Sequence, residues 1–299
     1  MSLLLSNVTK KFGEHVAVNK LNLEIPDSEL FGFLGGNGAG KTTTFRMILG
    51  LLDQTAGEIT WNGESINYHK SHLIGYLPEE RGLYPKLKVK EQLIYLGKLR
   101  GMTKQSALTE LKKWLDRFQI PNYIDKKVEE LSKGNQQKIQ FISAVIHRPK
   151  LLILDEPFSG LDPINVEMLK EAVIDIKESG TSVVFSSHQM SHVEELCENI
   201  CILRDGTAVV EGNIKEIKRS FGKKNVRIVS DESIDFLQDV NGVLSFKRRN
   251  DGCELQISDE QVSQEILSKL AGNGFIRKFE LEEPSLNDIF IEKVGENYE

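Results

Sequence analysis

The sequence predicts an α/β protein with a mostly parallel sheet, followed by a second, smaller α+β unit. Three observations support this fold class. Short continuous apolar runs at residues 30–34 (LFGFL), 151–154 (LLIL) and 183–185 (VVF) suit strands that are buried on both faces. Amphipathic helical patterns alternate with these runs, as in a parallel sheet with crossover helices. Beyond residue 225, strand-like and helix-like segments follow one another in a different order.

Residues 1–60 are expected to form strands that lead into a glycine-rich turn and then a helix. The run LFGFL is followed by GGNGAGKTT, after which apolar residues recur at helical spacing. Further along the chain, two dipeptides stand between strand-like segments and predict tight hairpin turns, Asn62-Gly63 and Asp205-Gly206.

The middle of the chain is predicted to be helical. The pattern at residues 89–118 is typical of helix that ends before Pro121, and another helix is expected over about 135–147. We therefore expect a first domain at residues 1–220, in which a helical insert at about 87–147 interrupts the strand–helix alternation.

A basic segment at residues 217–225 (IKRSFGKKN) breaks the alternating pattern and is predicted to link two domains. After it we expect strand, helix, strand, strand, helix, strand and a last helix. The first six of these elements have the order of a small ferredoxin-like sandwich. The sequence therefore predicts an accessory α+β domain at residues 225–299.

Composition and charge narrow the functional class. The 299 residues include 38 Lys+Arg against 44 Asp+Glu, a net charge of −6, whereas a general nucleic-acid binder normally carries a basic footprint. Three cysteines are too few for a disulfide scaffold and fit a reducing compartment. No stretch reaches the about 18 consecutive apolar residues of a membrane span, and the N-terminus lacks a signal-peptide pattern. We expect a cytoplasmic protein that needs another chain to reach across a membrane.

The glycine-rich segment after LFGFL carries the strongest functional signal. It fits G-x-x-x-x-G-K-[ST] and lies between a predicted strand and a predicted helix, so a glycine turn without ligand is disfavoured. Glycines allow backbone N–H groups to surround phosphate oxygens, and the helix N-terminus adds positive charge. Lys41 is expected to reach the β- and γ-phosphates, and Thr42 to offer its hydroxyl to Mg²⁺. The predicted nucleotide-binding residues are Gly35, Gly36, Asn37, Gly38, Ala39, Gly40, Lys41, Thr42 and Thr43.

Acidic residues and a histidine follow two further strands. Asp155 and Glu156 end the LLIL strand, at the edge where a doubly wound sheet presents its ligand-binding residues. An Asp there can hold Mg²⁺, and an adjacent Glu can orient and deprotonate an attacking water. His188 follows the strand VVF. Alone, these residues are more typical of an acidic strand end and a structural histidine, but the phosphate loop favours catalytic roles.

The segment LSKGN at residues 131–135 opens the helix predicted over about 135–147. A Ser and a Gly at a helix N-terminus can bind an anion. In isolation, however, Ser132 would be read as a helix cap.

Together these motifs resemble those of a known family, the nucleotide-binding subunits of ABC transporters, which are P-loop NTPases. The phosphate loop, LSKGN, LLILDEP, SGLD at residues 159–162 and SSH at residues 186–188 occur in the order of that family. The resemblance covers about residues 2–220. The last segment, EEPSLNDIFIEKV, is similar to the extra domain of bacterial exporter ATPases of the sodium-extrusion and multidrug branch.

The resemblance implies an ATP- and Mg²⁺-dependent ATPase that powers export through a separate integral membrane permease. In this family two nucleotide-binding subunits pair head to tail, as a homodimer or a heterodimer. Each ATP lies between the phosphate loop of one subunit and the signature segment of the other. The protein is accordingly expected at the inner face of the cell membrane. Its substrate stays open among sodium, drugs, lipids and peptides.

The resemblance also implies roles for individual residues. Phe12 matches the aromatic residue that stacks on adenine, and Asp162 would couple the two ATP sites. Ser132 and the Gly134 N–H would bind the γ-phosphate held by the partner subunit. The catalytic set that the resemblance implies is Lys41, Glu156 and His188, and the metal-binding set is Thr42, Asp155 and Glu79.

Four positions, in three segments, depart from the commoner family pattern. Lys133 and Asn135 stand where Gly and Gln are usual, and Gly36 stands in place of a common proline. Glu79, in GYLPEERGLY, replaces a glutamine that contacts Mg²⁺ and the membrane partner in the family. A carboxylate can still bind Mg²⁺, but it adds negative charge near Glu156.

Other interpretations have less support. A soluble ABC-type ATPase acting on ribosomes or DNA usually carries two nucleotide domains or a long coiled coil, whereas this chain has one phosphate loop. A nucleotide-gated sensor would need weak hydrolysis, which the presence of both Glu156 and His188 disfavours. His192, Cys197 and Cys201 fit no zinc spacing, and the cysteines are expected to pack inside the protein.

Overall fold

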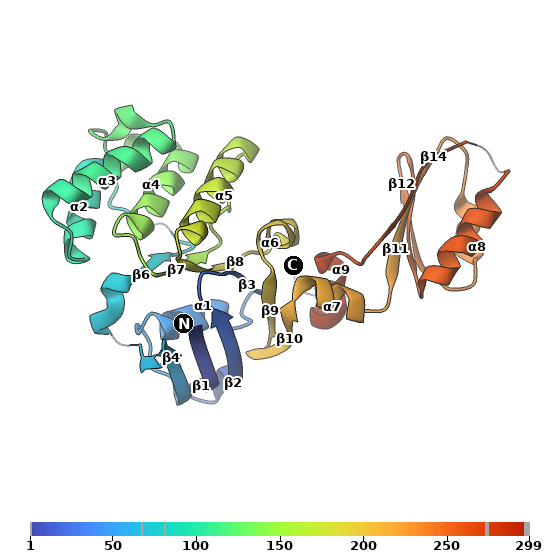
Figure 1. The fold of residues 1–299 in the computed structure, drawn as a ribbon, viewed down its shortest axis with the longest axis horizontal. Helices are drawn as coiled ribbons and strands as arrows, with labels where there is room; N and C mark the ends of the chain where they lie inside the picture. Colours follow the sequence, from blue (N-terminus) through green and yellow to red (C-terminus); the bar gives the residue numbers. More distant parts are fainter. Residues whose placement is uncertain (1, 67, 81, 273–274, 296–299) are drawn as a thin grey trace. The chain divides into compact units, whose positions relative to one another are not determined.

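The computed structural model describes residues 2–66, 68–80, 82–272 and 275–295 (Figure 1). The chain forms two compact units, the first ending at Glu211 and the second beginning at Gly212. The boundary predicted from the sequence lies further along, between residues 220 and 225. The difference arises because helix α7 (Ile214–Ser220) packs against helix α9 (Leu286–Val294) and so belongs to the second unit.

The first unit begins with an antiparallel sheet in the strand order β2-β1-β4-β5. Its strands are β1 (Ser2–Phe12), β2 (His15–Pro26), β4 (Ala56–Trp61) and β5 (Glu64–Ser65). The predicted hairpin between β4 and β5 is confirmed, because Asn62 and Gly63 both have positive φ angles, 56° and 74°, as a tight two-residue turn requires.

A six-stranded sheet in the order β10-β9-β3-β8-β7-β6 forms the centre of the first unit. Its strands are β3 (Leu30–Gly35), β6 (Ile74–Leu77), β7 (Leu151–Asp155), β8 (Ser182–Ser186), β9 (Asn199–Arg204) and β10 (Thr207–Asn213). The three apolar runs of the sequence are β3, β8 and β7, which lie side by side, pair in parallel and are buried along their length. The predicted parallel α/β sheet is therefore confirmed.

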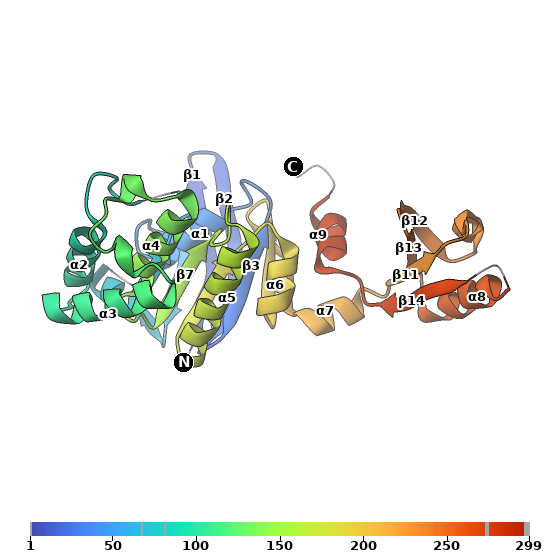
Figure 2. The same cartoon turned by 90° about the horizontal axis from the view of Figure 1, so that it is seen from above.

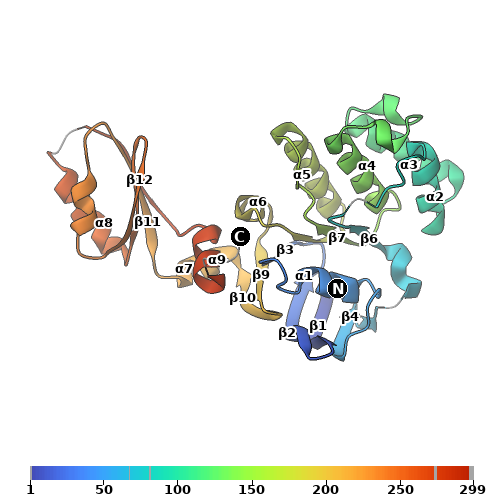
Figure 3. The same ribbon diagram turned by 180° about the vertical axis from the view of Figure 1, so that it is seen from behind.

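Helix α1 (Lys41–Ile48) lies between the two sheets (Figure 3). One hydrophobic core joins side chains from both sheets to those of α1. The ring of Phe45, for example, lies 5.4 Å from that of Phe33 on β3 and is fully buried. This packing fixes the start of α1, and with it the glycine-rich turn that precedes the helix.

The helical insert contains α2 (Val89–Leu99), α3 (Lys104–Arg117) and α4 (Lys133–Val145), which group on one side of the unit (Figure 2). The helical pattern at residues 89–118 thus corresponds to two helices. The break occurs because Gly101 adopts φ 88° and Thr103 caps α3 by accepting a hydrogen bond from the Ser106 N–H at 3.1 Å. Helices α5 (Pro163–Glu178) and α6 (Met190–Leu196) follow β7 and β8.

The second unit is a four-stranded antiparallel sheet in the order β12-β13-β11-β14. After α7 its elements are β11 (Lys224–Ser230), β12 (Val243–Arg249), β13 (Gly252–Ile257), α8 (Glu260–Leu270), β14 (Ile276–Glu282) and α9. Alternate residues of β11 and β13 pack against α8 in a core of their own. The first helix predicted here is only a 3-10 turn, Asp235–Asp239, while the remaining order agrees with β-α-β-β-α-β.

Candidate nucleotide-binding site

The phosphate loop, residues 35–43, includes the end of β3, the turn that follows and the start of α1, and the turn has a conformation that requires glycine. Gly40, at the N-cap of α1, has φ 104°, and a Cβ atom there would lie 2.5 Å from the Ala17 carbonyl oxygen. The Lys41 ammonium is folded back onto the loop and donates to the carbonyl oxygens of Gly35 at 2.7 Å and Gly36 at 3.1 Å. Burial lowers the pKa of Lys41, while the nearby carboxylate of Glu156 opposes that shift.

A cavity of about 470 Å³ lies above this loop. It brings together most of the predicted site residues, namely Phe12, Gly36, Asn37, Gly38, Ala39, Gly40, Lys41, Thr42, Thr43, Glu79, Asp155, Glu156 and His188. His15 and Ala17 also line it and were not predicted from the sequence. The signal for His15 was the turn at Gly13, which places His15 opposite Phe12 across the β1–β2 hairpin.

Thr42 and Asp155 meet on the floor of the cavity. The Thr42 hydroxyl donates to Oδ2 of Asp155 at 3.1 Å, and the Asp155 side chain is almost fully buried. A hydroxyl oxygen and a carboxylate oxygen at this separation are hard donors that fit Mg²⁺. Glu79 lies on the cavity wall, in a loop that the Gln140 amide holds from both sides by donating to the carbonyl oxygens of Pro78 and Glu80.

Glu156 and His188 form a pair at the carboxyl ends of β7 and β8. Nδ1 of His188 lies 2.9 Å from Oε2 of Glu156, whose side chain is 9% exposed. Burial raises the pKa of Glu156, although His188 and Lys41 partly oppose this shift. A carboxylate with a raised pKa is a better base, so the pair suits proton abstraction from water.

The signature residues and Asp162 do not line this cavity. Ser132 caps α4 by accepting from the Asn135 N–H at 3.3 Å, and Asp162 caps α5 by accepting from the Asn165 N–H at 3.1 Å. The two caps are neighbours, because a Cβ atom on Gly134 would lie 3.3 Å from Nδ2 of Asn165. The N-terminal ends of α4 and α5 therefore form a second polar surface, separate from the phosphate loop of the same chain.

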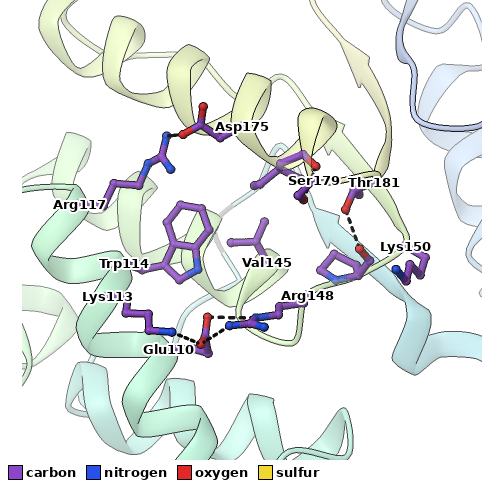
Figure 4. A pocket seen from close by; sticks show the side chains of 12 residues that line it. Glu110, Lys113, Trp114, Arg117, Val145, Arg148, Lys150, Asp175, Ser179 and Thr181 are labelled. Atoms are coloured by element: carbon purple, nitrogen blue, oxygen red, sulfur yellow. Dashed lines mark hydrogen bonds and ion pairs between the residues drawn. The ribbon is translucent and has the colours of Figure 1, made fainter.

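A larger cavity of about 640 Å³ lies between α3 and α5, around Trp114 (Figure 4). Its charged side chains are largely paired with one another. Arg117 contacts Asp175 at 2.5 Å, and Arg148 contacts Glu110 at 2.6 Å. It has no glycine-rich loop, so the smaller cavity is the better nucleotide site.

His192 and the two cysteines of the zinc alternative do not gather around a metal-sized site. Cys197 and Cys201 are buried, and burial raises the pKa of both thiols. The His192 ring packs edge-on against Phe158 at 5.0 Å. Among the described residues, no group of three His, Cys, Asp or Glu side chains is arranged to hold a metal ion.

Comparison with known proteins agrees with the motifs. The ABC transporter family model matches residues 18–159, and the model for the C-terminal domain of DrrA1-3-like ATP-binding proteins matches residues 212–294. The ABC transporter ATP-binding protein YhaQ of Bacillus subtilis is 66% identical over 99% of this chain and 100% of its own length. The chain belongs to the family of ABC transporter ATP-binding subunits.

More distant relatives include a subunit named for export and a solved ATP-binding subunit. The Nod factor export ATP-binding protein I of Cupriavidus metallidurans is 32% identical over 98% of this chain and 97% of its own length. A solved ATP-binding subunit of an ABC transporter superimposes with a TM-score of 0.70 at 28% identity, covering 74% of this chain and 94% of that one. The chain is the ATP-hydrolysing subunit of an ABC transporter. These relatives favour that function over an ATPase acting on ribosomes or DNA.

Proposed function

We propose that this subunit binds MgATP on the loop at residues 35–43 and hydrolyses it with Glu156 as the general base. The observation that carries the proposal is the Glu156–His188 pair, which faces the same cavity as Lys41. The family hydrolyses ATP and works with a membrane permease. The proposal adds which side chains of this chain perform each part.

Lys41, Thr42 and Asp155 provide the charge and the oxygen ligands that a nucleotide phosphate needs. The Lys41 ammonium exchanges its two carbonyl partners for the β- and γ-phosphate oxygens. The Thr42 hydroxyl and the Asp155 carboxylate would hold Mg²⁺, and Glu79, which also lines the cavity, would be a further oxygen ligand. When bound, Mg²⁺ neutralises charge on the phosphate oxygens.

Glu156 accepts a proton from the attacking water, and His188 orients both. Because the Glu156 side chain is buried, little water competes for its carboxylate, and this makes the carboxylate a stronger base. The His188 side chain is 64% exposed, so its second ring nitrogen can reach the γ-phosphate while Nδ1 stays with Glu156.

Phe12 is proposed to stack on the adenine ring. It is the last residue of β1, borders the cavity and is 50% exposed, which is unusual for a phenylalanine. The Lys10 ammonium lies 5.1 Å from its ring centre. An adenine on the free face would cover this apolar ring without disturbing the hydrophobic core.

A second nucleotide-binding subunit is proposed to complete each site. Ser132 and the Gly134 N–H, at the positive end of α4, are not part of the cavity in their own chain. Head-to-tail pairing brings them onto the γ-phosphate of the partner subunit's ATP, with Asp162 at the contact between the two sites. A homodimer and a heterodimer both satisfy this geometry.

An integral membrane permease is proposed to dock on an apolar groove of the first unit, which places the subunit at the inner face of the membrane. The groove has a volume of about 230 Å³ and is lined by Leu49, Leu51, Ile74, Tyr76, Leu96, Leu99 and Arg100. Leu51 and Leu99 are 62% and 63% exposed, a large apolar surface for a protein without a partner. No helix among the described residues is long and apolar enough to cross a membrane.

The substitution Glu156→Gln tests the proposal. It removes the base but keeps the size of the side chain, so ATP binding is expected to stay near the wild-type level while turnover falls by about 100-fold or more. Binding is measured with a fluorescent ATP analogue, and turnover by phosphate release. A variant that hydrolyses ATP at near-normal rates would refute Glu156 as the base.

A further inference from the structure

Ser186 is a buried polar residue that is not among the residues proposed to bind or hydrolyse ATP. It is the last residue of β8, and its side chain has no exposed surface. Its hydroxyl donates to Oδ1 of Asp155 at 2.6 Å and accepts from the Glu156 N–H at 3.2 Å. Because a serine hydroxyl has one hydrogen and two lone pairs, it can make both bonds at once.

The sheet register brings these groups together. Strands β7 and β8 pair in parallel with Asp155 opposite Ser186, although the two residues are 31 positions apart in the chain. The preceding residues of β8, Val183 to Phe185, are apolar and buried, as expected in a central strand. A hydroxyl at this position forms a hydrogen bond with Oδ1 of Asp155 and another with the Glu156 N–H, whereas an aliphatic side chain would form neither.

The bond to Asp155 fixes the direction of its carboxylate. Oδ1 is held by the Ser186 hydroxyl, at a length typical of a strong bond from a hydroxyl to a carboxylate. Oδ2 is then directed toward Thr42, whose hydroxyl it accepts at 3.1 Å. With both oxygens held, the carboxylate cannot rotate away from the floor of the cavity.

The bond from Glu156 supports an unfavourable backbone conformation. Glu156 has φ 51°, in the left-handed region that is unfavourable for a residue other than glycine. Its N–H is the group that donates to Ser186. This conformation directs the Glu156 side chain toward His188, so the hydroxyl supports the geometry of the catalytic pair.

We infer that Ser186 is a positioning residue that aligns the metal-binding carboxylate of Asp155 and the general base Glu156 through one hydroxyl. The inference rests on the proposed function. It predicts that loss of the hydroxyl weakens the response to Mg²⁺ more than it weakens nucleotide binding without metal.

The chain offers a closely matched control in Ser182, the first residue of the same strand. Its hydroxyl also donates to an aspartate, Oδ1 of Asp27 at 3.2 Å, and accepts a backbone N–H, that of Ser28 at 2.9 Å. It is equally buried, at 3% exposure, but lies about 13 Å away along the strand, at its other end. Ser182→Ala therefore removes the same kind of bonds far from the nucleotide.

In the test, the affinity of the full-length chain for a fluorescent ATP analogue is measured at increasing Mg²⁺ concentrations. The result is the Mg²⁺ concentration that gives half of the maximal increase in affinity. We expect Ser186→Ala to raise this concentration by about 10-fold, as for other residues that orient metal ligands, with affinity in EDTA unchanged. Ser182→Ala should match wild type. Ser186→Cys, which is nearly isosteric but a weak donor, should behave like Ser186→Ala and covers the case in which the alanine variant does not fold. Ser186→Thr, which keeps the hydroxyl, should retain most of the response.

Two results would overturn the inference. One is a wild-type Mg²⁺ response in Ser186→Ala and Ser186→Cys. The other is an equal loss in Ser186→Thr, which would mean that packing rather than the hydroxyl matters. If wild type and Ser182→Ala show no Mg²⁺-dependent nucleotide binding, the proposed function fails and the inference with it.

Discussion

Alanine substitutions at two glycines of the phosphate loop test how far ATP binding depends on the backbone conformation of the loop. Gly38 and Gly40 have φ angles of 77° and 104°, so alanine at either position is strained. A left-handed conformation costs an L-residue about 1–2 kcal/mol. The surroundings differ, because a Cβ atom on Gly38 meets nothing within 4 Å, whereas one on Gly40 lies 2.5 Å from the Ala17 carbonyl oxygen.

That overlap adds to the strain at Gly40. Backbone overpacking costs about 1–3 kcal/mol more, and the loop must shift away from Ala17 to relieve it. Since about 1.4 kcal/mol corresponds to a tenfold change, we expect Gly40→Ala to bind ATP at least about fivefold more weakly than Gly38→Ala. Titration of a fluorescent ATP analogue measures both affinities, and urea unfolding shows whether each variant is folded. Equal affinities would refute the view that contact with β2 holds the loop in its binding conformation.

Two further predictions concern stability and partner binding. Burial lowers the pKa of His147 from 6.5 to about 4, so the folded protein binds its proton less readily than the unfolded chain. The free energy of unfolding therefore decreases as pH falls from about 6.5 toward 4. Between pH 7 and pH 5, urea unfolding should show that wild type loses about 2 kcal/mol more of this free energy than His147→Leu. Equal losses in the two proteins would contradict this prediction. For the groove, Leu51→Asp should reduce recovery of a multi-span membrane protein from mild-detergent extracts by about tenfold, whereas Ile174→Asp, at an exposed position on α5, should not. Equal recovery with both variants would place the permease elsewhere.

The sequence predicted those parts of the site that are local in the chain. The phosphate loop is one contiguous motif, and the runs that became β3, β7 and β8 are apolar along their whole length, so their character needs no tertiary information. Asp155, Glu156 and His188 follow such strands directly, and parallel strands bring their carboxyl ends to one edge. The phosphate loop follows β3, whose neighbour in the sheet is β8, which explains why these residues share a cavity.

Features that depend on register or on a backbone turn were not predicted. The bonds of Ser186 require β7 and β8 to pair with Asp155 opposite Ser186, and no periodicity in the sequence specifies that offset. The helical pattern at residues 89–118 continued across Gly101 because the flanking residues keep a helical spacing, although the chain turns there.

Helix α4 joins three functional segments that are far apart in the sequence. Ser132 caps its first turn, and the Gln137 amide donates to the carbonyl oxygen of Pro157, the residue after Glu156. One turn later the Gln140 amide holds the carbonyl oxygens on either side of Glu79. Both glutamines are buried, where a lost hydrogen bond is costly, so α4 cannot shift without breaking these bonds or carrying both segments with it. The signature segment, the loop of Glu79 and the backbone beside the proposed general base Glu156 are therefore held as one hydrogen-bonded unit.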